Sequence, residues 1–263
     1  MEKNLVFFFS ATGNSLKVAK DIAGALENCE VVTMGVYNSH TLIKPGYSRI
    51  GFIYPVYGAG LPKRVTEFIG GLNLSGNKET YYFSVPTYGT VSGNALAQID
   101  KLLQAKGARL DYGIALKMVH NNCANFNMNR KNVPKRNAEA DAKIPDIVSE
   151  IKSKAQSPAP KEKFPFTLIH PQVMKLVSGG DKNFNVSAVC TGCGTCTMVC
   201  PVSNIEIVDK QPSFQHHCEQ CFACIQWCPT EAVNYKNASQ KHGRFHNPHI
   251  TLHELIEKNR GSM

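Results

Sequence analysis

Eight of the ten cysteines in this 263-residue chain fall in two short runs with the same internal spacing. The first run comprises Cys190, Cys193, Cys196 and Cys200, and the second comprises Cys218, Cys221, Cys224 and Cys228. Each run reads C-x2-C-x2-C-x3-C-P. Three thiolates at a three-residue step can hold three iron atoms of a cubane, and the fourth ligand then comes from another part of the chain. The spacing therefore predicts two [4Fe-4S] clusters.

The two runs also predict which cysteines share a cluster, because in repeats of this kind the last cysteine of each run binds the other cluster. We assign one cluster to Cys190, Cys193, Cys196 and Cys228, and the second to Cys218, Cys221, Cys224 and Cys200. Zinc is the alternative metal, but zinc sites use pairs of cysteines with a longer gap between the pairs. Disulfides fit less well, because disulfide frameworks disperse their cysteines along the chain.

A second site is indicated near the N-terminus, where the segment Ser10-Ala-Thr-Gly-Asn-Ser15 follows an apolar run and leads into a helical pattern. Its hydroxyl groups, a glycine and the free amides of a helix N-terminus together suit a phosphate group. The simpler interpretation is an ordinary helix N-cap. Neither the G-x-x-x-x-G-K-[ST] motif nor G-x-G-x-x-G after a strand occurs, so a mononucleotide is favoured over a nucleoside triphosphate or a dinucleotide.

Two further loops place a tyrosine beside a glycine at the ends of predicted strands. One is Pro55-Val-Tyr-Gly58, and the other runs from Pro86-Thr-Tyr-Gly89 to Gly93. In open parallel sheets, ligands bind beyond the carboxyl ends of the strands. Tyr57 and Tyr88 could therefore enclose a flat ring, although either tyrosine alone is more often simply packed.

The first 155 residues alternate between short apolar runs and amphipathic helical patterns, which is typical of an α/β sandwich. We expect five strands, near residues 5–9, 31–34, 50–54, 81–85 and 114–119. A further amphipathic helix over residues 140–151 contains Pro145, which we expect to bend or interrupt it. The proline- and charge-rich segment 157–163 predicts a linker, and residues 164–183 form a connector of undefined structure.

These motifs resemble two known families: the S-x-T-G-N-S turn and the two aromatic loops are similar to flavodoxin, and the cysteine region is similar to a two-cluster bacterial ferredoxin. Their order resembles the flavodoxin-ferredoxin fusion proteins of anaerobic bacteria and archaea, as does the tail from Arg244 to Ile256. The resemblance implies a flavodoxin-like five-stranded parallel sheet of order 2-1-3-4-5 and a small α+β domain with two [4Fe-4S] clusters.

The resemblance also implies a bound flavin mononucleotide (FMN). Its phosphate would lie against Ser10, Thr12, Gly13, Asn14 and Ser15. Its ring would lie near Pro55, Val56, Tyr57, Gly58, Thr87, Tyr88, Gly89, Gly93, Asn121 and Asn122. In the segment Val119-His-Asn-Asn-Cys123 the chain departs from its relatives, which often carry a proline before the asparagines.

The expected organisation has four parts. They are an FMN-binding domain over residues 1–156, a linker over 157–183, a ferredoxin domain over 184–236 and a tail over 237–263. The tail contains the capping box Thr251-Leu-His-Glu254, which predicts a short terminal helix.

The formal net charge is +9, and six of the nine excess positive charges fall in residues 117–182. The loop from Asn121 to Arg136 carries Arg130, Lys131, Lys135 and Arg136 and follows the fifth predicted strand. This loop is either simply solvated or a docking site for an acidic protein or an anionic small molecule. Because the region shows neither a recognition helix nor interleaved aromatic residues, nucleic-acid binding is not expected.

We therefore expect an iron-sulfur flavoprotein that moves electrons between two clusters and FMN. Reduced ferredoxin or a similar redox protein is the expected donor, and the acceptor is an unidentified small molecule or protein. A pure electron carrier and a redox sensor are the alternatives. No catalytic acid or base is identified, so the cofactors carry the chemistry. We expect a cytoplasmic chain without a membrane span, and a homodimer in which one chain brings its clusters to the other's flavin is a further possibility.

Overall fold

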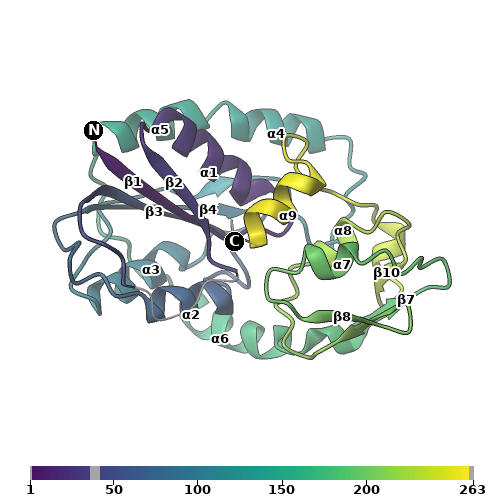
Figure 1. Ribbon diagram of the computed structural model, residues 1–263. Coiled ribbons are helices and arrows are strands. Elements are labelled where there is room, and N and C mark those ends of the chain that lie inside the picture. Colours follow the sequence, from purple (N-terminus) through teal and green to yellow (C-terminus); the bar gives the residue numbers. More distant parts are fainter. Residues whose placement is uncertain (1, 36–41, 261–263) are drawn as a thin grey trace.

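The computed structural model describes residues 2–35 and 42–260 and combines an α/β domain with a smaller cysteine-rich domain (Figure 1). The α/β domain contains β1 (Lys3–Phe8), β2 (Cys29–Thr33), β3 (Tyr47–Pro55), β4 (Tyr81–Tyr88), β5 (Tyr112–Gly113) and β6 (Leu116–Lys117). Its parallel strands follow the order β2-β1-β3-β4-β5, and β6 also pairs with β4. The predicted strand order is confirmed, and the fifth predicted strand consists of two short pieces.

Two helical layers cover the two faces of this sheet (Figure 1). They contain α1 (Asn14–Ala25), α4 (Val133–Asp141) and α5 (Ile144–Lys152) on one face, and α2 (Lys63–Gly71) and α3 (Ala95–Gln104) on the other. Strand β1 supplies both cores because successive side chains of a strand point to opposite faces. Val6 and Phe8 pack in the core with α1, whereas Leu5 and Phe7 pack in the core with α2 and α3.

The helix expected over residues 140–151 is interrupted close to Pro145, as predicted. Helix α4 ends at Asp141 and α5 begins at Ile144, with Pro145 in its first turn. A proline fits there because the first amides of a helix have no partner within the helix. The buried Arg49 of β3 binds the other end of α5: its guanidinium donates to the carbonyl oxygens of Ile151, at 3.1 Å, and Lys152, at 2.7 Å.

We expect Arg49→Ala to lower the free energy of unfolding by about 2 kcal/mol, because it leaves carbonyl groups at the C-terminus of α5 without their charged donor. The melting temperature should fall by about 4–8 °C, measured by circular dichroism on anaerobically prepared protein. Lys154→Ala is the matched control, because Lys154 also pairs with Glu2 but is exposed. Its effect should stay within about 0.5 kcal/mol. Equal effects of the two substitutions would contradict the assigned role of Arg49.

The cysteine-rich domain repeats one local structure around each cysteine run. Short helices α7 (Thr195–Met198) and α8 (Ala223–Gln226) each contain the third cysteine of a run. Each begins after a residue in the left-handed region, Gly194 with φ 77° and Phe222 with φ 60°. Antiparallel strand pairs flank them: β7 (Phe184–Val186) with β10 (Val233–Tyr235), and β8 (Ile205–Val208) with β9 (Gln211–Phe214). The internal repeat in the sequence is therefore a structural repeat as well.

Two helices outside both units lie close to the predicted sites. The connector forms α6 (Phe166–Val177), which the sequence analysis left undefined, and a 3-10 turn η1 (Gly180–Asn183). In Figure 1, α6 runs along the bottom of the molecule towards the cysteine-rich domain. The predicted terminal helix is present as α9 (Leu252–Arg260), and the amide of Glu254 donates to the Thr251 hydroxyl at 3.2 Å, as the capping box requires. A second 3-10 turn, η2 (Ser239–Lys241), lies near the start of the tail.

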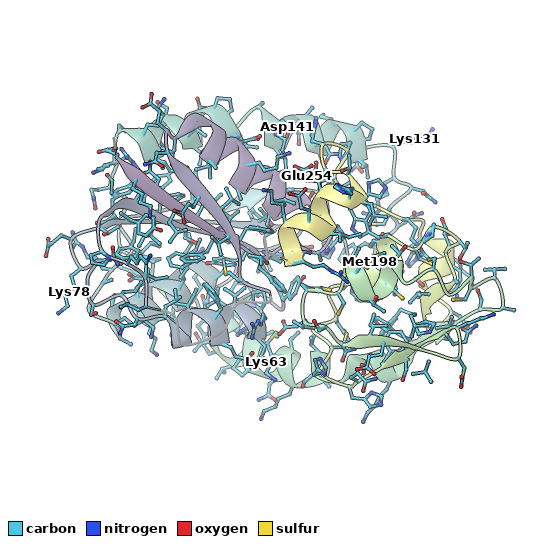
Figure 2. The ribbon with its side chains drawn as sticks, in the orientation of Figure 1. Lys63, Lys78, Lys131, Asp141, Met198 and Glu254 are labelled. Atoms are coloured by element: carbon cyan, nitrogen blue, oxygen red, sulfur yellow. The ribbon has the colours of Figure 1, made fainter. Side chains whose placement is uncertain are left out.

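Helix α9 lies between the two units, where the yellow ribbon of Figure 1 crosses in front of the sheet. Figure 2 shows Glu254 on this helix, and its carboxylate forms an ion pair with Lys20 of α1. Within residues 2–35 and 42–260, no helix combines the length and the apolar character that crossing a membrane requires.

Candidate functional site

A cavity lies at the carboxyl ends of the parallel strands, where the sequence analysis placed the phosphate and the ring of a nucleotide. We call it the strand-end cavity. It is lined by Ser10, Ala11, Thr12, Asn14, Ser15, Pro55, Val56, Tyr57, Thr87, Tyr88, Gly89, Met118, Val119, His120 and Asn121. Most of the residues predicted to bind a mononucleotide therefore meet in one place, although they come from loops far apart in the sequence.

The hydroxyl groups of the first loop face a buried polar environment. Ser10 is 2% exposed and Thr12 is 3% exposed. The Ser10 hydroxyl is buried and finds no hydrogen-bond partner among the described residues. Buried polar groups are almost always paired, so an unpaired hydroxyl lining a cavity is an observation that points to a ligand. A phosphate oxygen is an acceptor that would satisfy it.

Residues from the C-terminal third of the chain form hydrogen bonds to the backbone of this loop. Three successive carbonyl oxygens are acceptors: that of Ser10 for Asn259 Nδ2 at 3.2 Å, that of Ala11 for Trp227 Nε1 at 3.0 Å, and that of Thr12 for the Asn247 amide at 2.8 Å. These bonds fix the peptide planes of the loop before any ligand binds. Sequence analysis missed these partners because they lie more than 200 residues away.

Asn14 and Ser15, predicted as phosphate ligands, also hold neighbouring loops together. Asn14 Nδ2 donates to the Val119 carbonyl at 3.0 Å, and its Oδ1 accepts from Asn247 Nδ2 at 3.0 Å. The hydroxyls of Ser15 and Thr87 are 2.9 Å apart. The side-chain amide of Asn14 is thus engaged in positioning three loops, whereas its backbone amide begins helix α1.

Three of the predicted glycines, Gly13, Gly58 and Gly93, lie outside the strand-end cavity. Gly13 has φ +92°, and a Cβ there would lie 3.0 Å from Ile250 and 3.1 Å from Asn247, so glycine allows the tail to pack against the loop. Gly93 packs against Ala59, where a Cβ would lie only 2.0 Å from the Ala59 carbonyl oxygen. The absence of a side chain at Gly93 therefore allows the loop of Ala59 to pack closely against it.

Tyr57 and Tyr88, the two predicted ring neighbours, line the same cavity but differ in environment. Tyr88 ends β4 and is half-buried. The Tyr57 hydroxyl is buried and has no hydrogen-bond partner among the described residues. Burial raises the pKa of Tyr57 well above its usual value, and the thiolate positions of Cys221 and Cys218 and the carboxylate of Glu219 raise it further. The hydroxyl therefore lies near the second cysteine run.

A neighbouring cavity extends from these loops to the cysteine-rich domain, and we call it the inter-domain cavity. It is lined by Val56, Tyr57, Gly58, Ala59, Gly89, Thr90, Val91, His120, Asn121, Asn122, Val173, Val177, Glu219, Gln220 and Phe222. Helix α6 forms one wall, and His170 Nδ1 lies 3.2 Å from the Gly58 carbonyl oxygen. The segment treated as a connector therefore helps to build the site.

Asn121 and Asn122, predicted as ring contacts, have different partners. Asn121 Nδ2 donates to the Cys221 carbonyl at 3.4 Å, and its own carbonyl accepts from Gln226 Nε2 at 2.6 Å. Asn122 Oδ1 accepts from the amide of Ala124 at 3.1 Å. Asn121 thus connects the strand-end cavity to the cysteine-rich domain, while Asn122 stabilises its own turn.

His120 was not singled out in the sequence, yet it lines the strand-end and inter-domain cavities. Its ring stacks on Phe126 with centroids 3.9 Å apart, and its Nδ1 accepts from the Asn122 amide at 3.0 Å. Burial, together with Arg136 and Arg130, lowers its pKa to about 4. The imidazole is therefore neutral at pH 7, with its proton on Nε2.

The predicted cluster ligands gather in two groups. Cys190, Cys193, Cys196 and Cys228 line one small cavity. In the other group, Cys200 and Cys218 lie close enough to Cys221 and Cys224 to disfavour thiolates there electrostatically, and burial raises the pKa of all four. We call the group of Cys190, Cys193, Cys196 and Cys228 the outer cysteine set, because Cys193 is exposed. We call the group of Cys200, Cys218, Cys221 and Cys224 the inner cysteine set, because Cys221 and Cys224 are buried. Coordination to a metal centre would keep such buried cysteines in the thiolate form.

Among the described residues, no three or more His, Cys, Asp or Glu side chains converge on a point that could hold a single metal ion. A cubane bonds each thiolate to a different iron, so its ligands surround the cluster and need not converge in this way. Outside the two sets, Cys123 is fully buried and burial raises its pKa to about 11. It therefore packs as an apolar side chain and does not provide a thiolate at pH 7.

Different parts of the chain match different known proteins. Residues 182–229 match the 4Fe-4S dicluster domain family. Among curated proteins, no sequence match was found. Similar solved structures cover the other half: a flavodoxin from Streptococcus pneumonia TIGR4 at 17% identity and a TM-score of 0.39, covering 59% of this chain and 100% of that one.

Two further solved structures overlap the same region: a flavodoxin from the domain Archaea, at 17% identity and a TM-score of 0.37, and an FMN-dependent NADH-azoreductase from Bacillus anthracis, at 9% identity and 0.41. Each covers 57% of this chain and 99% of its own. At these scores the fold assignment rests on the strand order itself, which is that of flavodoxin. The chain therefore joins a flavodoxin-like α/β domain to a C-terminal 4Fe-4S dicluster domain and has the organisation of an electron-transfer protein.

Proposed function

We propose that this protein is an iron-sulfur flavoprotein that binds FMN in the strand-end cavity and transfers electrons between FMN and two [4Fe-4S] clusters. The observation that carries the proposal is the position of Tyr57. Its ring lines the predicted flavin site, and its hydroxyl lies near Cys218 and Cys221 of the inner cysteine set. One buried side chain thus borders both the predicted flavin site and the side of the cysteine-rich domain that carries the inner set. Electron tunnelling between FMN and a cluster would require the two sites to adjoin in this way.

The fit to FMN rests on the donors of the first loop. Ser10 supplies a buried hydroxyl without a partner, and Thr12 and Ser15 lie beside it at the start of α1. A helix N-terminus favours an anion such as a phosphate. The polar phosphate would lie against this loop, and the flat ring would lie towards Tyr57 and Tyr88. Bound there, FMN would supply the ability to exchange single electrons with the clusters and electron pairs with an acceptor.

Exposure favours the outer cysteine set as the place where a donor protein would approach. The outer cysteine set includes the exposed Cys193, whereas the inner set borders the flavin site. Cys224 also interacts electrostatically with Cys196, so the two sets lie close together. A reduced ferredoxin or similar donor would therefore deliver electrons at the outer cluster, and the inner cluster would pass them to FMN. The protein would then act as a ferredoxin-fed reductase.

The test is anaerobic purification with iron and flavin analysis, followed by stopped-flow mixing with reduced ferredoxin. We expect about eight irons per chain and one FMN, with the flavin reduced after the clusters. Reoxidation by small molecules would support a reductase, whereas reoxidation only by a protein acceptor would indicate the carrier alternative. Redox-dependent partner binding without electron flux would indicate a sensor. Absence of flavin from protein with intact clusters would overturn the proposal.

A further inference from the structure

A further cavity adjoins the strand-end cavity on the side of the basic loop. We call it the basic cavity. It shares Gly89, Val119 and His120 with the strand-end cavity. A molecule bound in the basic cavity would therefore touch the same walls as a ligand bound at the strand ends.

Three cationic side chains from three different segments line the basic cavity. Lys117 ends β6, Arg130 lies in the following loop and Arg136 lies in α4. None of the described residues that line the cavity is an aspartate or a glutamate. Like charges gathered around one space repel one another, and an anion bound among them relieves that repulsion. Arginine pairs can also bind a carboxylate or phosphate through two parallel hydrogen bonds.

The other residues that line the basic cavity are uncharged and include two stacked rings. The rings of His120 and Phe126 stack with an interplanar angle of 26°, and Val133 of α4 lies nearby. Because His120 Nδ1 accepts the Asn122 amide, its Nε2–H remains a neutral donor. The cavity thus combines cations with an apolar, aromatic wall, as sites for small organic ligands do.

We propose that the basic cavity binds a small organic anion, in which a carboxylate or phosphate contacts Lys117, Arg130 and Arg136 and a flat apolar body packs on Phe126. The bound anion would be the electron acceptor of this protein. That role rests on the function proposed above, because only a flavin bound in the strand-end cavity could pass electrons to a molecule in the basic cavity. Binding itself depends on the residues of this chain alone.

The structure divides the four cations of the predicted basic loop into two pairs. Arg130 and Arg136 line the cavity, whereas Lys131 and Lys135 do not. Lys135 lies 3.9 Å from Glu139, and Figure 2 shows Lys131 at the outer edge of the molecule. Of the four cations, the two arginines are thus the ones placed to contact a molecule in the basic cavity. The two lysines instead provide a control with the same change in net charge.

The test is calorimetric titration of anaerobically purified, cofactor-loaded protein with benzoate, phenyl phosphate and neutral benzamide. We expect benzoate or phenyl phosphate to bind and benzamide to bind at least about tenfold more weakly. The double substitution Arg130→Gln with Arg136→Gln should weaken anion binding by at least about tenfold, whereas Lys131→Gln with Lys135→Gln should change it less than about twofold. Tighter binding of benzoate identifies a carboxylate ligand, and tighter binding of phenyl phosphate identifies a phosphate ligand.

Two outcomes would overturn the inference. The first is that both double substitutions weaken anion binding equally, because that would be a general effect of surface charge. The second is that neither benzoate nor phenyl phosphate binds to the flavin-loaded protein. Iron and flavin contents of each variant, and its rate of reduction by ferredoxin, are measured on the same samples. Both variants should match the wild type in these respects. Protein that lacks flavin but binds benzoate through the arginines would overturn the proposed function and leave the anion site standing.

Discussion

Cys224→Ala is expected to remove one cluster and stop the reduction of the flavin by ferredoxin. Cys224 lies in the inner set, which borders Tyr57 and the predicted flavin site. Without its third thiolate the inner cubane should not persist, so iron content should fall from about eight to about four per chain. The remaining outer cluster would still accept electrons from ferredoxin, but the distance to the flavin would be too long for efficient tunnelling. Stopped-flow spectra should show cluster reduction without flavin reduction.

Cys193→Ala and Cys123→Ala complete this experiment. Cys193→Ala should also halve the iron content, but dithionite, a small reductant, should still reduce the flavin through the inner cluster. Cys123 is buried but belongs to neither set, so Cys123→Ala should retain about eight irons and the wild-type rate. Flavin reduction by ferredoxin at the wild-type rate in Cys224→Ala would contradict the assignment of the inner set as the flavin's electron donor.

The largest expected effect on cofactor affinity comes from the hydroxyls of the first loop. Ser10→Ala should weaken FMN binding by about 10- to 100-fold, because each hydrogen bond to a charged group contributes about 1.5–3 kcal/mol. Adding Thr12→Val should weaken it by a further factor of about ten or more. The dissociation constant is measured by the quenching of FMN fluorescence as apoprotein is added.

Riboflavin is the matched control ligand because it has the same ring system and no phosphate. Its affinity should be the same for the wild type and Ser10→Ala, since the Ser10 hydroxyl serves only the phosphate. Iron content reports that the dicluster domain is intact in each variant. If Ser10→Ala weakens riboflavin as much as FMN, the hydroxyl acts on the loop structure and the phosphate assignment fails.

The sequence alone was sufficient where the chemistry is local. The repeated cysteine spacing predicts two cubanes because three ligands of each lie within seven consecutive residues. The match of residues 182–229 to a dicluster domain agrees with this prediction. Short buried strands alternating with amphipathic helices predicted the α/β sandwich. The strand order itself was expected only from the resemblance to flavodoxin, and the structure has that order. The break before α5 was predictable from a single residue, Pro145.

Tertiary structure decided the features that depend on distant contacts. Trp227, Asn247 and Asn259 hold the phosphate loop by bonds to its carbonyls, and no periodicity in the chain marks them for that role. Helix α6 escaped prediction because Pro171 lies inside it, where a proline usually breaks a helix, and because none of its side chains is fully buried.

The sequence thus determined the dicluster domain and the redox groups that we propose for this protein, because ligand spacing and loop chemistry are properties of short segments. Only the tertiary structure decided which cysteine set borders Tyr57, and which cations of the basic loop line a cavity. Arg130 and Arg136 differ from Lys131 and Lys135 in orientation and not in charge. The orientation of the side chains of Lys135 and Arg136 depends on how α4 packs against the sheet. That packing is set by many contacts between residues that are far apart in the chain.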